Sequence, residues 1–521
     1  MSLQAAPSER RQRLAWRPAG GRDRRRYVFI FIGVLVLLRG LLLLGGAARA
    51  QAQQREPAEK PNVVFIYADD MGWKDVGFMG SPYFQTPHLD RLARQGMTFT
   101  AAYANAPNCA PSRAALLTGQ YAPRTGIYTV NSPARGPARL RKLIPIPNKR
   151  TLPREAVTVA DVLGEAGYAT ASMGKWHLGD PPERGPKAQG FDVNIGGYGI
   201  GNPNPFGAYF APWENPYLED DVAPGTYLTN HLTDRALAFV ERHRSRPFFL
   251  YLPFYNVHSP WQAPDSLVQK YQEQGKGAKV KPAYGAMIEA LDRNVGRLLA
   301  KLDALGLREN TIVVFTSDNG GHAAATSMKP LRGSKGTLYE GGIRVPLVVR
   351  WPGVTAPGST SDTPVVGTDV FPTLLEMTGT SVPAGKLLDG RSFVPLLRGR
   401  SDALVERALY WHFPAYLQSY TEAQGAWRTT PAGAIRKGAW KLIQFFETGR
   451  VELYNLEQDL AESRNRASER PQKAAQMLRL LKRWRRRTGA PVPATPNPAY
   501  DPESDDPESD DLESDGPSPN P

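Results

Sequence analysis

The sequence predicts an α/β fold: a large central, mostly parallel sheet sandwiched by helices, with a smaller C-terminal subdomain made of an antiparallel sheet plus a helix. Four short runs are continuously apolar, which is typical of strands buried on both faces of a parallel sheet; they cover residues 62–67, 248–252, 311–316 and 345–349. Segments with helical periodicity cover residues 86–95, 159–166, 228–242 and 284–305. Because strands and helices alternate, we expect an open sheet covered on both sides.

The first 50 residues have the features of an export signal. They are rich in arginine up to residue 26, then apolar over 27–44 with Arg39 inside, and end in the small-x-small pattern Ala48-Arg49-Ala50. We therefore expect residues 1–50 to be a signal peptide and the protein to be periplasmic or extracellular. An uncleaved anchor is the alternative, and only then would the protein contact a membrane; its span would be short and charged. The paired arginines also allow twin-arginine export.

Composition divides the rest of the chain. Residues 51–60 are polar and are expected to form a linker before the main α/β domain at 61–390. The C-terminal subdomain is expected over 391–488, with a hairpin turning at Lys437-Gly438, a strand at 451–456 and a helix at 471–487. Residues 489–521 are rich in Pro, Ser and Asp, so we expect a disordered acidic tail that cannot bury a core.

The chain carries a net charge of +14, which favours an anionic partner. Nucleic acid is one such partner. The basic residues are scattered, however, and no nucleic-acid-binding motif is present. We therefore expect a smaller anionic substrate and no nucleic acid.

Polar side chains follow two of the predicted strands. Asp69 and Asp70 end the first, and Asp318 and Asn319 end the run at 311–316. Ligands of open α/β sheets bind beyond the carboxyl ends of strands, where these side chains would converge. Either pair alone could be a solvated turn. Together they predict an all-oxygen site for calcium, with magnesium as the less favoured ion.

Cys109 is the only cysteine, so it cannot form a disulfide within the chain. A buried structural cysteine is the simplest interpretation. Its surroundings favour another one, because it precedes Pro111, where we expect a helix to begin. A helix N-terminus presents free N–H groups and a positive dipole end to an anion.

Two motifs resemble the signatures of the type I sulfatases, which belong to the alkaline phosphatase superfamily. The first is C-A-P-S-R at 109–113 followed by A-A-L-L-T-G, and the second is G-K-W-H-L-G at 174–179. The resemblance covers roughly residues 61–466 and makes 61–390 the catalytic domain. It implies an arylsulfatase-like sulfuric ester hydrolase, in which a maturation enzyme oxidises Cys109 to formylglycine. The hydrate of that aldehyde is the nucleophile.

The resemblance also implies the roles of individual residues. Arg113 braces the oxygens of the nucleophile, Lys175 binds sulfate, and His177 acts as a base on the formylglycine hydroxyl. We expect Lys175 and His177 to share one side of an extended segment. His258 protonates the leaving oxygen, and Lys335 neutralises sulfate charge. The metal ligands implied are Asp69, Asp70, Asp318, Asn319 and the modified Cys109.

Other candidates have weaker signals. His322 follows the second metal pair and could reach the substrate, and Arg344 could support the site without touching it. We expect structural roles for the remaining histidines, which are His88, His231, His243 and His412.

Three functions fit these motifs. The first is hydrolysis of a small-molecule or saccharide sulfate ester. The second is hydrolysis of phosphate mono- or diesters on the same scaffold, because both groups are tetrahedral oxyanions. The third is non-catalytic binding of sulfated glycans with Cys109 as a free thiol. The histidines and lysines favour catalysis, because a binding protein needs no proton donor.

Overall fold

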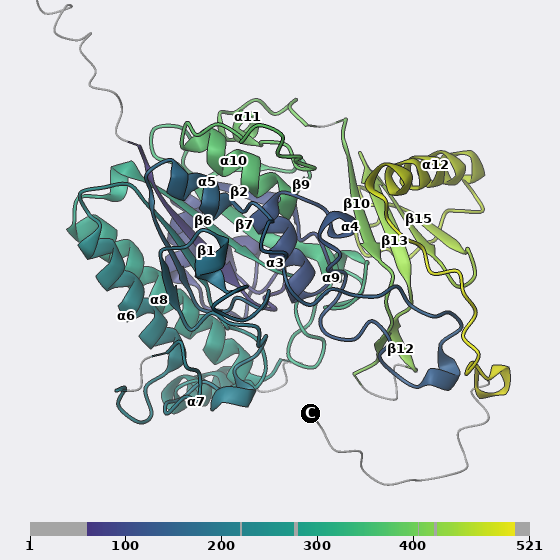
Figure 1. The fold of residues 1–521 in the computed structure, drawn as a ribbon, viewed down its shortest axis with the longest axis horizontal. Helices are drawn as coiled ribbons and strands as arrows, with labels where there is room; N and C mark the ends of the chain where they lie inside the picture. Colours follow the sequence, from purple (N-terminus) through teal and green to yellow (C-terminus); the bar gives the residue numbers. More distant parts are fainter. Residues whose placement is uncertain (1–59, 219–220, 276–279, 405, 421–424, 506–521) are drawn as a thin grey trace, which may run out of the picture. The chain divides into compact units, whose positions relative to one another are not determined.

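The computed structural model describes residues 60–218, 221–275, 280–404, 406–420 and 425–505 (Figure 1). The expected signal peptide and nearly all of the expected linker lie outside the described residues. Within the described part of the chain, no helix is both long enough and apolar enough to cross a membrane.

Nine strands of the described chain form the central sheet. In spatial order they are β4 (Val193–Ile195), β3 (Ala169–Met173), β5 (Phe248–Pro253), β1 (Asn62–Ala68), β6 (Thr311–Ser317), β7 (Arg344–Arg350), β2 (Met97–Tyr103) and β8 (Ser359–Ser361), with β9 (Val365–Val366) also paired to β2. Strand β7 runs antiparallel to β6 and β2, and every other pair is parallel. The predicted fold class is confirmed.

The sheet is covered on both faces because the side chains of β1 alternate between two apolar cores. Val64 and Ile66 pack into one core, and Val63 and Phe65 pack into the other. The first core is completed by α2 (Pro87–Gln95), α6 (Leu228–Arg242), α7 (Asp265–Gln274) and α8 (Pro282–Ala304). The second is completed by α3 (Cys109–Thr118), α5 (Val159–Glu165), α10 (Val370–Met377) and α11 (Val394–Leu397), on the opposite face in Figure 1.

The parallel register gathers four loops at one edge of the sheet. β1 pairs in parallel with β5 and β6, and β3 pairs in parallel with β5. The carboxyl ends of these four strands therefore lie side by side, and the residues that follow them share one place.

The C-terminal subdomain is an antiparallel sheet with one covering helix. Its strands are β10 (Ala408–Phe413), β13 (Ala432–Lys437), β14 (Trp440–Phe445) and β15 (Val451–Asn455), and the helix is α12 (Pro471–Thr488). The apolar stripe of α12, which includes Met477 and Leu481, packs on Ile435 and Leu442. A separate two-stranded sheet joins β11 (Leu417–Gln418) to β12 (Trp427–Thr429).

A buried ionic cluster joins this subdomain to the main sheet. Lys441 of β14 lies 2.9 Å from Glu340 and 2.9 Å from Glu462, and all three side chains are fully buried. Glu340 begins α9 (Glu340–Ile343) and also pairs with Arg344 at 3.2 Å. Arg344 therefore belongs to this junction.

The region beyond residue 488 differs from the expectation of disorder. Residues 489–505 run along the loop at 138–144: Ile144 N donates to Thr495 O at 2.9 Å, and Asn497 N donates to Lys142 O at 3.0 Å. Two irregular segments thus satisfy each other's backbone groups, which composition alone does not reveal. Residues 506–521 lie outside the described part.

Candidate active site

Four acidic or thiol groups meet at the carboxyl edge of the sheet. Asp69 and Asp70 follow β1, Asp318 follows β6, and Cys109 is the first residue of α3. One ligand atom from each lies within 4.8 Å of all the others, and all four residues are buried. Asn319 joins them by donating from Nδ2 to Asp70 Oδ1 at 2.8 Å. The structure therefore brings together all the residues that the sequence analysis proposed as metal ligands.

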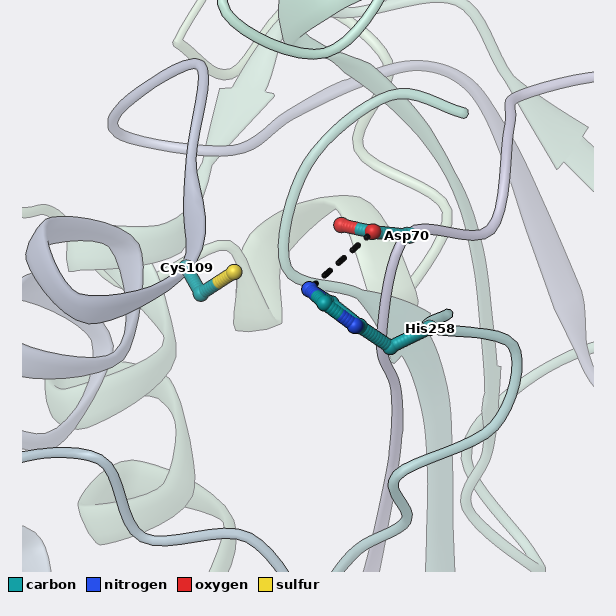
Figure 2. Close-up of side chains that lie close together, drawn as sticks. All are labelled: Asp70, Cys109 and His258. Carbon is teal, nitrogen blue, oxygen red and sulfur yellow. Dashed lines mark ion pairs between the residues drawn. The ribbon is translucent and has the colours of Figure 1, made fainter. Parts of the chain in front are cut away.

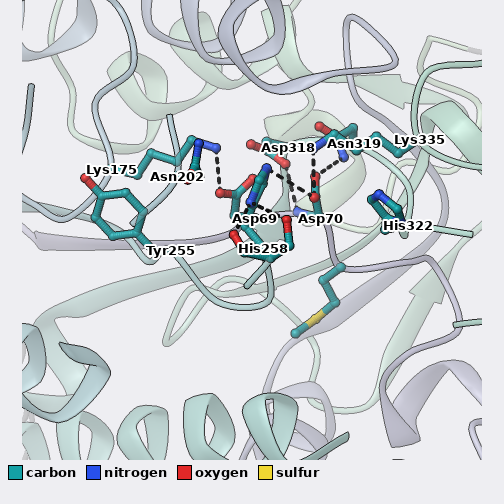
Figure 3. A network of polar contacts seen from close by, with 12 residues as sticks. Asp69, Asp70, Lys175, Asn202, Tyr255, His258, Asp318, Asn319, His322 and Lys335 are labelled. Carbon is teal, nitrogen blue, oxygen red and sulfur yellow. Dashed lines mark hydrogen bonds and ion pairs between the residues drawn. The ribbon is translucent and has the colours of Figure 1, made fainter. Parts of the chain in front are cut away.

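A cation faces each carboxylate of this cluster (Figure 3). Lys175 Nζ lies 2.6 Å from Asp69 Oδ2, and Lys335 Nζ lies 2.7 Å from Asp70 Oδ2. Arg113 donates from Nη2 to Asp318 Oδ2 at 2.8 Å and from Nε at 3.0 Å.

Burial, the paired cations and the neighbouring carboxylates together set the protonation of the acids. Burial opposes ionisation of Asp70, but Lys335 and His258 hold its pKa well below the usual range. Burial and the nearby Asp69 raise the pKa of Asp318 to about 7.

The cluster fits a hard divalent cation. Asp69 Oδ1 and Asn319 Oδ1 are buried and have no hydrogen-bond partner among the described residues, although buried acceptors are normally satisfied. Both oxygens belong to the group of three carboxylates and one amide. Calcium and magnesium prefer such oxygen ligands, whereas zinc and copper prefer nitrogen and sulfur.

Cys109 lies at the N-terminus of α3, with Asn108 as the residue before the helix. The helix begins two residues before the predicted start at Pro111, because proline is tolerated throughout a first turn, where backbone N–H groups have no helical partner. Burial raises the pKa of the Cys109 thiol to about 12. Figure 2 shows its sulfur pointing toward Asp70 and His258, and one atom of each of these three side chains lies within 4.8 Å of the other two.

Lys175 and His177 follow β3, but not in an extended segment as predicted. His177 has a φ of 63°, in the left-handed region. Tertiary hydrogen bonds impose this path: Lys175 N donates to Pro253 O at 2.7 Å, and His177 N donates to Tyr198 O at 2.9 Å. Both side chains still reach the site. Burial, followed by the charge of Lys175, lowers the pKa of His177 well below its ordinary value.

Gly201 makes room for the imidazole of His177. A Cβ on Gly201 would lie 2.1 Å from Cε1 of that ring, well inside contact distance. This position therefore requires glycine.

His258 follows β5 and faces the cluster through one ring nitrogen. Its Nδ1 lies 2.7 Å from Ser259 O, a carbonyl that only accepts, so Nδ1 carries a proton. Nε2 lies 3.6 Å from Asp70 Oδ2. Burial and the charge of Lys335 lower the pKa of His258 to about 3.

A cavity of about 420 Å³ opens above these groups. Cys109, His177, His258 and Lys335 line it together with four polar residues that sequence reasoning missed, which are Asn131, Arg135, Asn202 and Arg428. These four come from loops and from β12 and belong to no motif. The excess of basic residues along the chain was the only signal for the two arginines.

Of the other histidines, His322 lies beside the cluster and belongs to the network of Figure 3. Burial lowers the pKa of His322 to about 4, and the charges of Asp70 and Lys335 also act on it. The ring of His322 packs between Trp261, at a centroid distance of 5.3 Å, and Tyr420, at 3.9 Å. The remaining four lie in other elements: His88 in α2, His231 in α6, His243 at the C-terminal end of α6, and His412 in β10.

Comparison with known proteins decides the family. A model described as sulfatase matches residues 61–380, which is more than half of the chain. The chain belongs to the sulfatase family. It is accordingly a sulfuric ester hydrolase, as the two sequence motifs predicted. A second model, described as the C-terminal part of N-sulphoglucosamine sulphohydrolase, matches residues 334–487.

Similar proteins span most of this sulfatase. A sulfatase of Formosa agariphila is 33% identical, covering 88% of this chain and 94% of the relative. The steryl-sulfatase of Mus musculus is 34% identical over 73% of each chain. The crystal structure of Ps i-CgsB in complex with k-i-k-neocarrahexaose superposes with a TM-score of 0.68 at 30% identity, covering 82% of this chain and 93% of that one.

Proposed function

We propose that this sulfatase hydrolyses sulfate esters of saccharides, using a formylglycine made from Cys109 and a bound calcium ion. One observation carries the proposal: in a chain of this family, the only cysteine begins a helix directly above a buried cluster of three carboxylates and three cations. A purely structural cysteine needs no such surroundings.

Calcium would be held by Asp69, Asp70, Asp318 and Asn319, with residue 109 alongside. The two buried oxygens without partners support this assignment, because a cation would satisfy both. When bound, the ion supplies positive charge that favours ionisation of a hydroxyl and stabilises charge on sulfate oxygens. Magnesium is the alternative ion, since it takes the same ligand type.

Formylglycine at position 109 supplies a hydrated aldehyde, in which one hydroxyl can attack sulfur and the other can later lose a proton so that sulfate departs. The residues around it divide the remaining work. Arg113 fixes the carboxylate of Asp318 beside the nucleophile. Lys335 places an ammonium group on the lining of the pocket, and Lys175 adds a second, fully buried charge beside Asp69; both charges favour the sulfate. His177 accepts the proton of the second hydroxyl.

His258 is the proton donor to the leaving oxygen. Without substrate, burial and Lys335 lower the pKa of His258, which favours the neutral ring. The negative charge of an arriving sulfate ester opposes the effect of Lys335 and favours protonation at Nε2. The ester S–O bond then breaks, and the oxygen leaves as an alcohol. Overall, the ester and water give alcohol, sulfate and a proton.

The walls of the pocket support a saccharide substrate. Asn131, Arg135, Asn202 and Arg428 offer hydrogen-bond donors and acceptors to a polyhydroxylated ring. A steroid, by contrast, needs a largely apolar wall. The similarity to a structure solved with a neocarrahexaose agrees with this proposal.

Export belongs to the same proposal. We infer that residues 1–50 direct the chain out of the cytoplasm and that a maturation enzyme of the host modifies Cys109. The domain boundaries proposed are 61–390 for the catalytic domain and 391–488 for the C-terminal subdomain.

Mass spectrometry of the peptide that contains Cys109 tests the proposal. Active protein should show the mass change expected when the thiol CH2–SH becomes an aldehyde CHO. Cys109→Ala, which cannot be converted, is the matched control and should be inactive. A fully active preparation with an intact thiol would overturn the assignment. Rates with matched sulfate and phosphate esters of one phenol test the reaction class, and the sulfate ester should react faster.

A further inference from the structure

Two arginines on the wall of the cavity have no anionic partner among the residues that the structure describes. Arg135 lies in the loop that follows α4 (Ala122–Thr125), and Arg428 lies in β12 of the C-terminal subdomain. Both line the same cavity as Cys109 and Lys335. Within the described part of the chain, neither arginine forms an ion pair, and no Asp or Glu lines that cavity.

Arg135 is held only by neutral groups. Its Nη2 donates to Val130 O at 2.8 Å, and Nε donates to Ser132 O at 3.4 Å. Nη2 also lies 3.5 Å from Thr129 Oγ1, which accepts from Asn108 Nδ2 at 2.9 Å. Asn108 directly precedes the nucleophile position. The guanidinium is therefore oriented beside the reaction centre while its full charge stays available.

Arg428 is oriented by an aromatic ring and one carbonyl. Its guanidinium carbon lies 3.8 Å from the centroid of the Tyr420 ring, and Nη1 donates to Lys335 O at 3.4 Å. Its Nε is buried and has no hydrogen-bond partner in the described ranges of the chain. The guanidinium thus lies beside the backbone of Lys335 and forms no ion pair with Asp70 in the described structure, whereas the Lys335 ammonium lies 2.7 Å from Asp70.

The two segments that carry these arginines are packed on each other. A Cβ on Gly136, the residue after Arg135, would lie 2.5 Å from the ring of Trp427, the residue before Arg428. Tyr416 N also donates to Pro133 O at 2.8 Å. Close packing from both chain neighbours fixes the relative position of the arginines.

Two positive charges held close together without an anion destabilise the protein, and a bound anion would remove this cost. Burial and the neighbouring Arg135 lower the pKa of Arg428 to about 10, and burial lowers the pKa of Arg135. Two other buried arginines are compensated, Arg113 by Asp318 and Arg407 by Asp369. Arg350 is buried without an ion pair in the described part of the chain, but it does not line this cavity. Two partly buried like charges without a carboxylate indicate a binding site whose missing partner is the ligand.

We propose that Arg135 and Arg428 form a second anion subsite, so that the preferred substrate is a saccharide carrying another anionic oxygen group beside the sulfate that is cleaved. The inference rests on the proposed function and adds its substrate class. The planar guanidinium forks match the oxygens of either a second sulfate or a uronic acid carboxylate. A substrate with a single sulfate uses that sulfate at the reaction centre and leaves the two arginines without an anionic partner.

Steady-state kinetics of the matured, calcium-loaded enzyme test the proposal. The substrates are a monosulfated saccharide, the same saccharide with a second sulfate, the same saccharide with a carboxylate, and 4-nitrophenyl sulfate. We expect the parent enzyme to prefer a doubly anionic saccharide. Arg428→Gln and Arg135→Gln should each lower the ratio of kcat/KM between the doubly and singly anionic saccharides by about tenfold or more, mainly through KM. If kcat/KM rises only with the second sulfate, or only with the carboxylate, that group is the one that the subsite binds.

Two further variants separate charge loss from general damage. Arg428→Lys keeps the charge but loses the fork, so the ratio should fall less than in Arg428→Gln. Arg154→Gln removes an equal charge from an exposed position outside the cavity lining and should leave the ratio as in the parent. An unchanged ratio in both glutamine variants, or a parent without preference for a second anion, would overturn the subsite.

Direct binding keeps the test independent of catalysis. Calorimetry with Cys109→Ala and the disulfated saccharide should show at least about tenfold weaker binding when Arg428→Gln is added. Hydrolysis of the monosulfated saccharide as fast as of the doubly anionic ones would sink the subsite but leave the proposed function standing. Absence of hydrolysis with every sulfate ester, together with tight binding that depends on Arg428, would sink the function but leave the subsite standing.

Discussion

At the scale of single residues, the site is a balance of buried charges. Three carboxylates each face one cation: Lys175 at Asp69, Lys335 at Asp70 and, from α3, Arg113. A buried ion without a partner would cost several kcal/mol, so each pair stabilises the folded protein as well as the arrangement of the site. Replacing one member consequently changes metal binding, activity and stability together.

Asp318→Asn tests this coupling. The amide keeps the shape but removes the charge that calcium needs and that compensates Arg113 at 2.8 Å. We expect calcium content to fall below stoichiometric and activity to drop by about 100-fold or more. Metal analysis and turnover of the same preparation check both. Asp389→Asn, which removes the partner of Arg124 at 2.7 Å outside the cluster, is the control. A variant with full calcium and normal turnover would remove Asp318 from the ligand set.

Cys109→Ser tests why an aldehyde hydrate is needed. A serine hydroxyl beside Asp70 and Arg113 can attack sulfur once, but it has no second hydroxyl on the same carbon. His177 then has no second proton to accept, and sulfate leaves only if water attacks a crowded anionic centre. We expect a single slow turnover that ends with a sulfate ester on residue 109, visible by mass spectrometry. Sustained turnover would instead indicate an ordinary two-step hydrolase.

At the scale of elements, the fold class and the four adjacent strands β5, β1, β6 and β7 were predictable, because these strands are buried on both faces and read as continuous apolar runs. The strands on either side of them, β3 and β2, were not predicted. The run at 311–316 could be read directly as β6, and the acidic pairs after two strands followed from parallel register. The left-handed backbone of His177 was not predictable, because hydrogen bonds from distant loops impose it. Arg135 and Arg428 were missed for a similar reason: they meet only through packing of two segments far apart in sequence.

The pairing of α2 with α8 illustrates an element held by a distant side chain. Thr86 precedes α2 but makes no capping bond. Asp292 of α8 accepts instead from His88 N at 3.2 Å and Leu89 N at 2.8 Å. Burial, with smaller contributions from nearby acids, raises the pKa of Asp292 to about 7. The two N–H bonds of the cap act in the opposite direction and favour the carboxylate, but burial outweighs them, so Asp292 is protonated over most of the acidic range.

Asp292→Asn should consequently change how stability depends on pH. Asp292 keeps its proton up to about pH 7 in the folded state, whereas it loses the proton near pH 3.8 in the unfolded chain. The contribution of Asp292 to the free energy of unfolding therefore falls as pH rises between those two values. Denaturant unfolding of the parent and the variant between about pH 5 and about pH 8 tests this. The free energy of unfolding of the parent minus that of the variant should decrease up to about pH 7 and then stay constant. The exposed Asp265→Asn serves as the control. A difference that is flat or rises with pH contradicts the assignment.

At the scale of the whole molecule, the C-terminal subdomain supports the metal cluster from behind. Lys441 holds Glu340 at the start of α9. The other end of that short helix contacts the loop after β6, where Gly320 N donates to Gly342 O at 3.0 Å. Gly320 follows Asn319 directly. Motion of the subdomain would thus be transmitted to a proposed metal ligand through one helical turn.

Lys441→Met should therefore weaken both the fold and the site. The variant leaves Glu340 with only Arg344 and Tyr103 as partners, and leaves Glu462 without its buried counter-charge. Breaking such a pair costs about 3–5 kcal/mol, which denaturant unfolding would detect. Calcium affinity should fall with it, because the loop that carries Asn319 loses its support.

Lys437→Met on the adjacent strand is the matched control for this prediction. Lys437 pairs with the exposed Glu406 at 3.1 Å, and such surface pairs contribute at most about 1 kcal/mol. It should leave both stability and calcium affinity close to those of the parent. If Lys441→Met lowers stability but leaves calcium affinity unchanged, the junction holds the two parts together without supporting the site. If it changes neither, the buried pairs contribute little net energy, and the apolar contacts around them alone join the subdomain to the sheet.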